Sequence, residues 1–376
     1  MIYLDYQATT PLAPEVAKAM RPWIDEAFAN PHSPSRWGHE AAAAVEVARK
    51  QVDKALGFKG GSIAFTGSAT EAINWALKGT VEKARARGSG QRNRIVTIAT
   101  EHAAVLDTCD WLAEQGVDLT VLPVQRDGRL DLDLLARELD DRVLLVAVMM
   151  VSNEIGVTQP ITGVANMAHD AGALKLCDAV QAFGRMDVCK GPDLVAMSAH
   201  KIHGPKGIGA LWMRKGHEPA ALIHGGGQEQ GLRSGTLSPA LCVGFGAAAK
   251  LAQDRCNRDY DHVEKLWRAA IQALGPGWTI NGSTAHRYPG NLNIRREGVD
   301  GARLLADLRD IAFSLGSACA SGSGRPSHVL RALGLDYRQA RSSIRLGFGR
   351  YTTEGELIEA CHRLARAAVE QEKLDA

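Results

Sequence analysis

The sequence predicts an α/β fold, in which a sheet is covered by helices on both faces and is followed by a smaller α+β unit. Short apolar runs alternate with long amphipathic stretches over the first two thirds of the 376 residues, and this texture changes near Pro239. The composition, 45% apolar and 23% charged, is that of a globular protein with a sizeable core.

Seven apolar runs are the expected strands of the first unit: residues 63–66, 94–98, 119–122, 143–148, 173–176, 194–197 and 208–212. Helical patterns fill the gaps, with the clearest at about 69–86 and 105–114. Ligands of such sheets bind at the carboxyl ends of the strands, so polar residues there are the first candidates for a site.

Beyond Pro239 a long helix is expected to about Leu274. Strands at 278–280, 291–294 and 343–346, and helices at 301–308, 327–333 and from 353, would build the smaller unit. The strand-like segment 2–6 could join it. The expected large domain spans residues 15–256. The expected small domain combines residues 1–14 with residues 257–376.

Charge and cysteine usage exclude several function classes. The net charge of +2 is spread along the chain, which argues against nucleic acid or an anionic membrane as a partner. No apolar run approaches the roughly 20 residues of a membrane helix, and Met1 leads directly into a strand-like run, so we expect a cytoplasmic protein. Seven cysteines, without a Cys-x-x-Cys pair, indicate reduced thiols and no metal site.

Three strand ends carry candidate chemistry. The turn from Thr66 to Glu71 opens a helix, where backbone N–H groups could bind a phosphate, although small residues before a helix usually form only a turn and cap. Asp178 ends a buried strand, and either a cofactor's pyridinium nitrogen or a helix cap would account for its carboxylate. Lys201 follows another strand; alone, such a lysine is usually a solvated surface residue.

Together these motifs resemble the cysteine desulfurases of the NifS/IscS family, in the class V aminotransferase superfamily. The resemblance is close to full length and is carried by residues 3–11, 153–156, 198–201, 224–236, 316–319, 326–330 and 340–345. It implies the fold type I of pyridoxal 5'-phosphate enzymes, with a mainly parallel seven-stranded sheet in the large domain and a smaller α+β domain.

The resemblance assigns the cofactor contacts. Lys201 holds the aldehyde of pyridoxal 5'-phosphate as a Schiff base, Asp178 pairs with the ring nitrogen, and Gln181 bonds the ring hydroxyl. His102 stacks on the ring face, although a histidine at that place is more often only a helix start. The phosphate contacts implied by the family come from Ala69, Thr70, Ser198 and His200, with Thr236 reaching in from the other subunit of a homodimer.

The substrate contacts and the nucleophile follow from the same resemblance. Asn153 lies beside the cofactor and the substrate, while Asn30 and Arg345 clamp the carboxylate of L-cysteine, for which a forked guanidinium is suited. Cys319 lies in a polar, glycine-rich run, where composition alone favours an incidental thiol. In this family it is the persulfide carrier, and it attacks as a thiolate, with His102 the expected proton acceptor.

The implied reaction converts L-cysteine to L-alanine and passes sulfur to Cys319, then to an acceptor such as an iron–sulfur scaffold or a thiolation protein. Two departures from the family pattern stand out. The phosphate turn has Gly67 before Ser68, whereas the family usually has serine before glycine. The residue that can adopt a positive φ therefore stands one place earlier in this turn. Arg325 stands where the family often has an acid, and we expect this to alter acceptor docking.

Rival interpretations stay open at this point. Another reaction on the same cofactor, such as selenocysteine lyase or transamination, is the nearest, and Cys319 argues against a plain transaminase. A sulfur-relay or assembly protein that kept the fold without catalysis is the alternative from another class. That alternative predicts a missing site residue, and the sequence lacks none.

Overall fold

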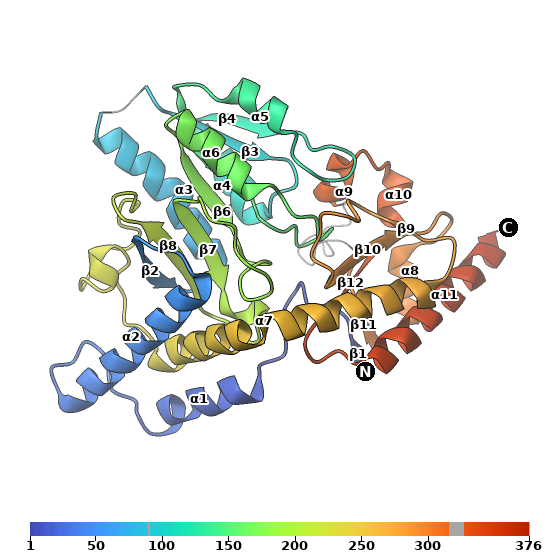
Figure 1. The fold of residues 1–376 in the computed structure, drawn as a ribbon, viewed down its shortest axis with the longest axis horizontal. Coiled ribbons are helices and arrows are strands. Elements are labelled where there is room, and N and C mark those ends of the chain that lie inside the picture. The colour runs from blue at the N-terminus through green and yellow to red at the C-terminus, as the bar shows by residue number, and fades with distance from the viewer. Residues whose placement is uncertain (89–90, 316–326, 376) are drawn as a thin grey trace.

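The computed structural model describes residues 1–88, 91–315 and 327–375. Its centre is a seven-stranded sheet in the order β2-β8-β7-β6-β5-β3-β4 (Figure 1). The strands are β2 (Gly61–Thr66), β3 (Arg94–Ile98), β4 (Asp118–Leu122), β5 (Val143–Ala147), β6 (Leu174–Asp178), β7 (Leu194–Ser198) and β8 (Gly209–Arg214). Only β8 runs antiparallel to its neighbours β2 and β7. The predicted seven-stranded, mainly parallel sheet is therefore confirmed.

Alternating residues of these strands face two separate cores. On one face Val96, Val146 and Val195 pack with α2 (Arg36–Leu56), α6 (Ile161–Asp170) and α7 (Pro239–Leu274). On the other, Ile95 and Leu145 pack against α3 (Ala69–Ala86) and α4 (Ala103–Glu114). Because both faces are buried, the strands are continuous apolar runs, and this is why they were evident in the sequence. The remaining helices of this unit are α1 (Pro14–Asp25) and α5 (Leu132–Glu138).

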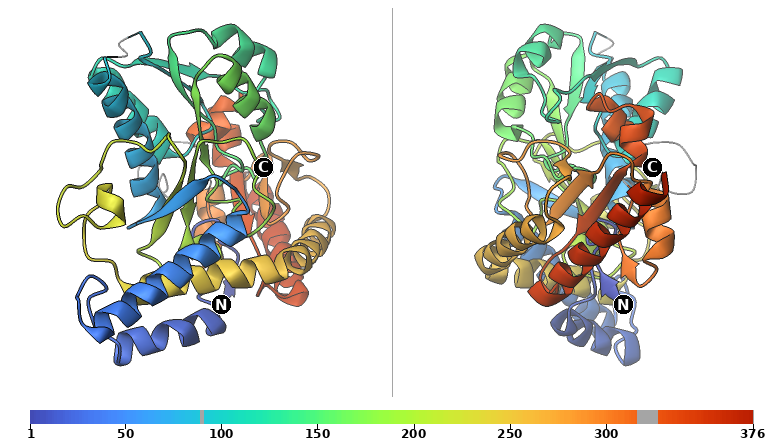
Figure 2. Two further views of the ribbon diagram at one scale, coloured as in Figure 1. Left: turned by 60° about the vertical axis from the view of Figure 1, so that its left-hand side comes forward. Right: turned by 90° about the vertical axis from the view of Figure 1, so that its right-hand side faces the viewer.

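The second unit is built on a three-stranded antiparallel sheet of β12 (Ser343–Gly347), β10 (Asn291–Arg295) and β9 (Thr279–Ile280). Its helices are α8 (Gly301–Asp307), α9 (His328–Ala332), α10 (Tyr337–Arg341) and α11 (Glu354–Asp375). Helix α7 runs from the large sheet to this unit (Figure 1), and Figure 2 shows α11 on its outer side. In the described part of the chain, no helix combines the length and apolarity needed to span a membrane.

The N-terminal segment joins the two units. Its strand β1 (Ile2–Tyr3) pairs in parallel with β11 (Ile311–Ala312) of the second unit. The predicted strand over 2–6 is too long, because the chain turns after Asp5, where the N–H groups of Ala8 and Thr9 both donate to the Asp5 carbonyl. Residues 5–10 then run to the large sheet, where the N–H of Thr10 donates to the His200 carbonyl at 3.0 Å. We call residues 5–10 the N-terminal strap.

Candidate active site

The phosphate turn lies between β2 and α3. Ser68 caps the helix, accepting the Glu71 N–H at 3.1 Å, and the Gly67 N–H donates to the Glu71 carboxylate at 2.9 Å. This leaves the N–H groups of Ala69 and Thr70 without an acceptor in the described part of the chain. Free donors at the positive end of an 18-residue helix are suited to an anion.

The unusual glycine order in this turn has a simple explanation. Gly67 does not have a positive φ, and Ser68 has the extended φ of −168° of a normal cap. Neither residue adopts the left-handed conformation, so the turn does not use the glycine's freedom at positive φ at either place. The glycine that matters is Gly209 on β8, since a Cβ there would lie 2.6 Å from the Ala69 nitrogen. Its absence lets the strand pass directly beside the turn.

Lys201 ends the short 3-10 helix η1 (Ala199–Lys201), which follows β7. Its amine donates to the carbonyls of Gln7 and Ala8 in the N-terminal strap, the latter at 2.8 Å. Burial, followed by the positive charges of Arg185 and Arg345, lowers the pKa of Lys201 to about 7. A large share of this amine is therefore unprotonated at neutral pH, which a nucleophile toward an aldehyde requires.

Asp178 is buried at the end of β6, where it accepts the Val180 N–H at 2.9 Å. Burial raises the pKa of its carboxyl, and the nearby His102 and Lys201 lower it. His102 caps α4, with Nδ1 accepting the Ala104 N–H at 3.1 Å. The neutral form of this imidazole therefore carries its proton on Nε2, and a proton from a thiol could be taken up only with loss of the cap.

The other predicted phosphate residues lie at the same edge. Ser198 is buried at the end of β7, and its hydroxyl makes no hydrogen bond within the described residues. His200 Nδ1 lies 3.1 Å from the Thr9 hydroxyl, and burial, together with Lys201, lowers the pKa of its imidazole to about 4. His200 is thus a neutral hydrogen-bonding group. We call residues 66–70, 178–181 and 198–201 the cofactor half of the site.

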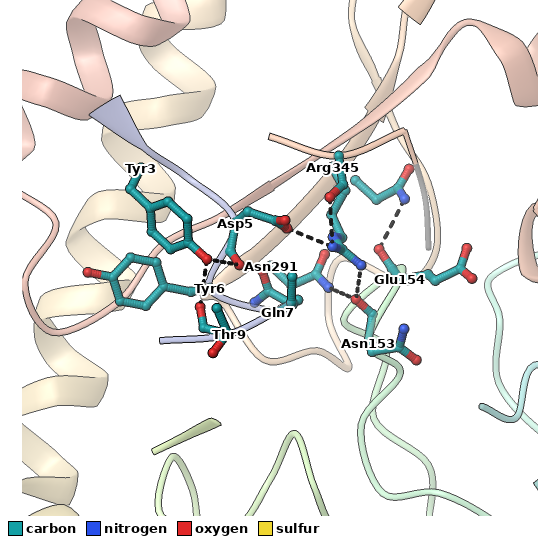
Figure 3. Close-up of polar contacts among 12 residues, drawn as sticks. Tyr3, Asp5, Tyr6, Gln7, Thr9, Asn153, Glu154, Asn291 and Arg345 are labelled. Atoms are coloured by element: carbon teal, nitrogen blue, oxygen red, sulfur yellow. Dashed lines mark hydrogen bonds and ion pairs between the residues drawn. The ribbon is translucent and has the colours of Figure 1, made fainter. Parts of the chain in front are cut away.

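Arg345 lies on β12, facing the cofactor half from the second unit. Its side chain is 1% exposed, and Nη2 is paired with Asp5 at 2.7 Å (Figure 3). The same guanidinium donates to the Asn153 carbonyl at 3.1 Å and the Ser314 hydroxyl at 3.0 Å, whereas Nε has no partner in the described chain. Figure 3 shows the Asn153 amide directed away from these contacts. We call Asp5, Asn153 and Arg345 the substrate half.

The chain around Cys319 lies outside the described residues, but the flanking residues are fixed to the site. Before it, the Ser314 N–H donates to the Arg345 carbonyl at 3.1 Å. After it, the Ser327 hydroxyl bonds the buried carboxylate of Glu154. The His328 ring lies 2.9 Å from the Glu101 carbonyl, beside His102. Both ends of the segment that carries the predicted nucleophile are therefore anchored at the site.

Two predicted residues are not brought to the site by a single chain. Asn30 is exposed in the connection between α1 and α2, which lies at the far side of the molecule from β12 in Figure 1. Thr236 is exposed beyond Arg233, whose guanidinium pairs with Glu71 on α3 at 2.7 Å. Neither has a described contact with Lys201 or Arg345. A single chain therefore does not bring either residue to the site.

Sequence reasoning missed two groups of functional contacts. The carbonyls of Gln7 and Ala8 hold the lysine amine, yet backbone atoms leave no trace in a sequence. Arg185 donates to the carbonyl of Lys201 at 3.0 Å and to the Gln181 side chain at 2.5 Å. Its position four residues after Gln181 was the only available signal.

Comparisons with known proteins agree with this geometry. The family model described as aminotransferase class V matches residues 2–359. A cysteine desulfurase IscS of Rickettsia bellii is 44% identical over 367 residues, which are 95% of this chain and 88% of that protein. A solved NifS-like protein superposes with a TM-score of 0.90 at 33% identity, covering 98% and 99% of the two chains. SspA, solved in complex with cysteine, gives a TM-score of 0.82 at 32% identity, covering 94% and 100%.

Proposed function

The chain belongs to the class V aminotransferase family and is a cysteine desulfurase, and we propose that it performs this reaction with pyridoxal 5'-phosphate held on Lys201. The observation that carries the cofactor assignment is the convergence, at one sheet edge, of three unlike groups. These are the free N–H groups at the start of α3, the buried carboxylate of Asp178 and the amine of Lys201 with its pKa lowered to about 7.

These groups fit the cofactor chemically. The free donors of Ala69 and Thr70, with the unpartnered hydroxyl of Ser198, suit a phosphate dianion. A buried carboxylate such as Asp178 is stabilised by a protonated ring nitrogen. When bound, pyridoxal 5'-phosphate supplies an electron sink for the bonds at the substrate's α-carbon.

The protein's own residues would divide the remaining work. Arg345 and Asn153 would orient the amino-acid carboxylate, which places the α-carbon toward Lys201. The lysine amine, once free, is positioned to move the α-proton. Asp178 would keep the ring nitrogen protonated. His102 would lie against the ring face, and its Nδ1 could accept a proton only by releasing the Ala104 N–H.

The sulfur step is assigned to Cys319 by family resemblance. Its thiolate attacks the sulfur of L-cysteine, so that an S–S bond forms as the C–S bond breaks and the electron pair of the C–S bond passes to carbon. Protonation of that carbon gives L-alanine, and the enzyme holds a cysteine persulfide. An acceptor then removes the outer sulfur, and we propose an iron–sulfur scaffold or a thiolation protein.

We further propose a homodimer in which Thr236 and Asn30 complete the neighbouring subunit's site. Exposure of both residues, away from their own chain's lysine, supports this arrangement. Cytoplasmic location and the effect of Arg325 on acceptor docking stay predictions.

Two variants test the proposal. We expect Lys201→Ala to lose both the yellow colour of the cofactor and all alanine formation from cysteine. We expect Cys319→Ala to keep the colour and lose alanine and sulfide formation. Turnover by a colourless Lys201→Ala protein would contradict the proposal.

The same assay separates the rival reactions. Amino-group transfer to a keto acid in Cys319→Ala would indicate a transaminase. Selenocysteine turnover that persists in Cys319→Ala, with no turnover of cysteine by the unaltered enzyme, would indicate a selenocysteine lyase.

A further inference from the structure

Arg185 lies in the loop after β6 and contacts two segments of the cofactor half and the N-terminal strap at once. Nε donates to the Lys201 carbonyl at 3.0 Å, Nη1 to the Gln181 side-chain oxygen at 2.5 Å, and Nη2 to the Tyr6 carbonyl in the N-terminal strap at 3.0 Å. Each nitrogen of the planar fork therefore has an acceptor on a different segment.

The charge of Arg185 has no direct counter-ion. All three acceptors are neutral, and no carboxylate contacts the guanidinium within the described part of the chain. The partly buried side chain lies over the Tyr288 ring, with Cζ 5.6 Å from its centroid. Burial lowers the pKa of Arg185, but a guanidinium stays charged at any physiological pH. It is thus a fixed cation directly behind Lys201.

We propose that Arg185 is a positioning residue of the active site, which fixes the amide orientation of Gln181 and supplies a permanent positive charge beside the amine of Lys201. This proposal rests on the proposed function, since Gln181 is assigned to the cofactor's ring hydroxyl there.

The orientation of Gln181 follows from donor and acceptor types. Arg185 can only donate, so the carbonyl end of the Gln181 amide must face it. The NH2 end therefore points the other way, where it donates to the Gln7 carbonyl at 3.0 Å and keeps a second N–H. A ring oxygen that meets this N–H must accept, which favours its ionised form over its protonated form.

The charged groups that face Lys201 are Arg185, Arg345, Asp5 and Asp178. Arg345 and Asp5 are paired with each other, so their effects on the lysine oppose one another. His200 is neutral at physiological pH, because burial lowers its pKa to about 4. Burial is the largest cause of the lowered pKa of Lys201, and Arg185 is the largest charge that adds to it.

A matched control exists in another arginine, the buried Arg287. It also donates only to neutral carbonyls, those of Ser283, Ile155 and Asn291, and its Cζ lies 4.0 Å from the centroid of the Trp267 ring. Arg287 is 8% exposed. It contacts no residue of the cofactor half. Removing it therefore reproduces the loss of a buried guanidinium without the loss of a charge beside Lys201.

The experiment measures cofactor capture by cofactor-free protein over a range of pH. Pyridoxal 5'-phosphate is added to the unaltered protein and to Arg185→Gln, Arg185→Met, Arg185→Lys and Arg287→Met, and the yellow colour is followed with time. The unaltered protein should reach its half-maximal rate near pH 7, the pKa of Lys201. The two neutral replacements at 185 should raise that midpoint by about one pH unit or more.

The other variants separate charge from geometry. Arg185→Lys keeps the charge and should keep the midpoint near that of the unaltered protein, but it loses the fork that holds Gln181. We therefore expect it to retain the cofactor about 5-fold less tightly, as for one lost hydrogen bond. Arg287→Met should lower the melting temperature and leave the midpoint unchanged.

An unshifted midpoint in both Arg185→Gln and Arg185→Met would overturn the proposal, as would an equal shift in Arg287→Met. If Arg185→Met fails to fold, Arg185→Gln against Arg185→Lys decides the question alone. Failure of the unaltered protein to develop colour at any pH would instead overturn the proposed cofactor, which keeps the two failures distinct.

Discussion

The cations in and next to the cofactor half of the site contact neutral oxygens, whereas the cation of the substrate half already has a charged partner. Lys201 and Arg185 contact backbone carbonyls and an amide, while Arg345 is paired with Asp5 at 2.7 Å. The first half is therefore electrostatically incomplete, and the second is close to neutral.

This difference indicates how each half meets its ligand. A dianionic cofactor that stays bound can complete a site whose positive charge was left unpaired. A substrate must come and go, and an unpaired guanidinium that is 1% exposed would be costly each time the site emptied. Asp5 stabilises Arg345 in the empty site, and a substrate carboxylate that binds Arg345 as proposed would have to share or replace that contact.

The largest expected effect tests the charge of the cofactor half. Asp178→Asn keeps the shape of the side chain but cannot hold the ring nitrogen protonated, so we expect cysteine turnover to fall by about 100-fold or more. Because Lys201 is intact, the yellow colour should remain. The measurement is alanine formation with the cofactor saturating.

Asp193→Asn is the matched control for this variant. Asp193, in the connection between β6 and β7, is also buried, but it accepts the Lys175 N–H at 2.9 Å and pairs with Arg214 at 2.8 Å. We expect it to lower the melting temperature with turnover changed only a few-fold. Equal losses of turnover in Asp178→Asn and Asp193→Asn would mean that Asp178 acts only through folding.

The next largest effect tests whether the charge of Arg345 is balanced within the substrate half. Asp5→Asn leaves Arg345 buried without a counter-ion, so we expect the empty protein to lose about 3 kcal/mol of stability. An added carboxylate ligand such as L-alanine should restore part of this loss, because it can take the vacated place. Denaturant unfolding with and without L-alanine measures both quantities.

Asp259→Asn provides the comparison, since Asp259 pairs with the 4%-exposed Arg350 at 2.7 Å and belongs to neither half. We expect the Asp259→Asn variant to be less stable than the unaltered protein, and we expect L-alanine not to restore the lost stability. If L-alanine raised the stability of both variants equally, Asp5 would have no special relation to the substrate's carboxylate.

Local pattern was sufficient for most of the fold. Helices α3 and α7 begin and end where the sequence predicts, because a serine caps each start and Pro239 follows Ser238 at the first turn of α7. The residues at strand ends, Asp178 and Lys201, were found for the same reason: strands that are buried on both faces leave polar residues only at their ends.

What the sequence could not supply is long-range pairing. Residues 2–6 were predicted as one strand, but β1 ends at Tyr3 and the N-terminal strap follows. The path of the strap is set by contacts nearly 200 positions away, such as the bond from Lys201 to the Ala8 carbonyl. The pairing of Asp5 with Arg345 also joins residues that lie far apart in the sequence. The same is true of the contact of Arg185 with Tyr6. Asn30 and Thr236 have no described contact with the site within one chain, so their roles in a homodimer stay predictions.

The smallest effect concerns the stability of the cofactor-free protein against pH. The folded pKa of Lys201, about 7, lies below its unfolded value of about 10.4. Between these two pKa values the unfolded chain binds more protons than the folded protein does. Because of this lysine, the free energy of unfolding therefore rises with pH, by at most about 1.4 kcal/mol per pH unit. Lys201→Met removes this contribution.

We therefore expect the unaltered protein to gain stability relative to Lys201→Met as pH rises from about 7 to 9, and the difference to be level below pH 6. Denaturant unfolding of both proteins across that range measures it. A difference that stayed flat above pH 7 would mean that the lysine is protonated in the folded protein. Lys201 would then carry a full positive charge, as Arg345 does. The two halves would differ only in that Arg345 has a counter-ion, Asp5.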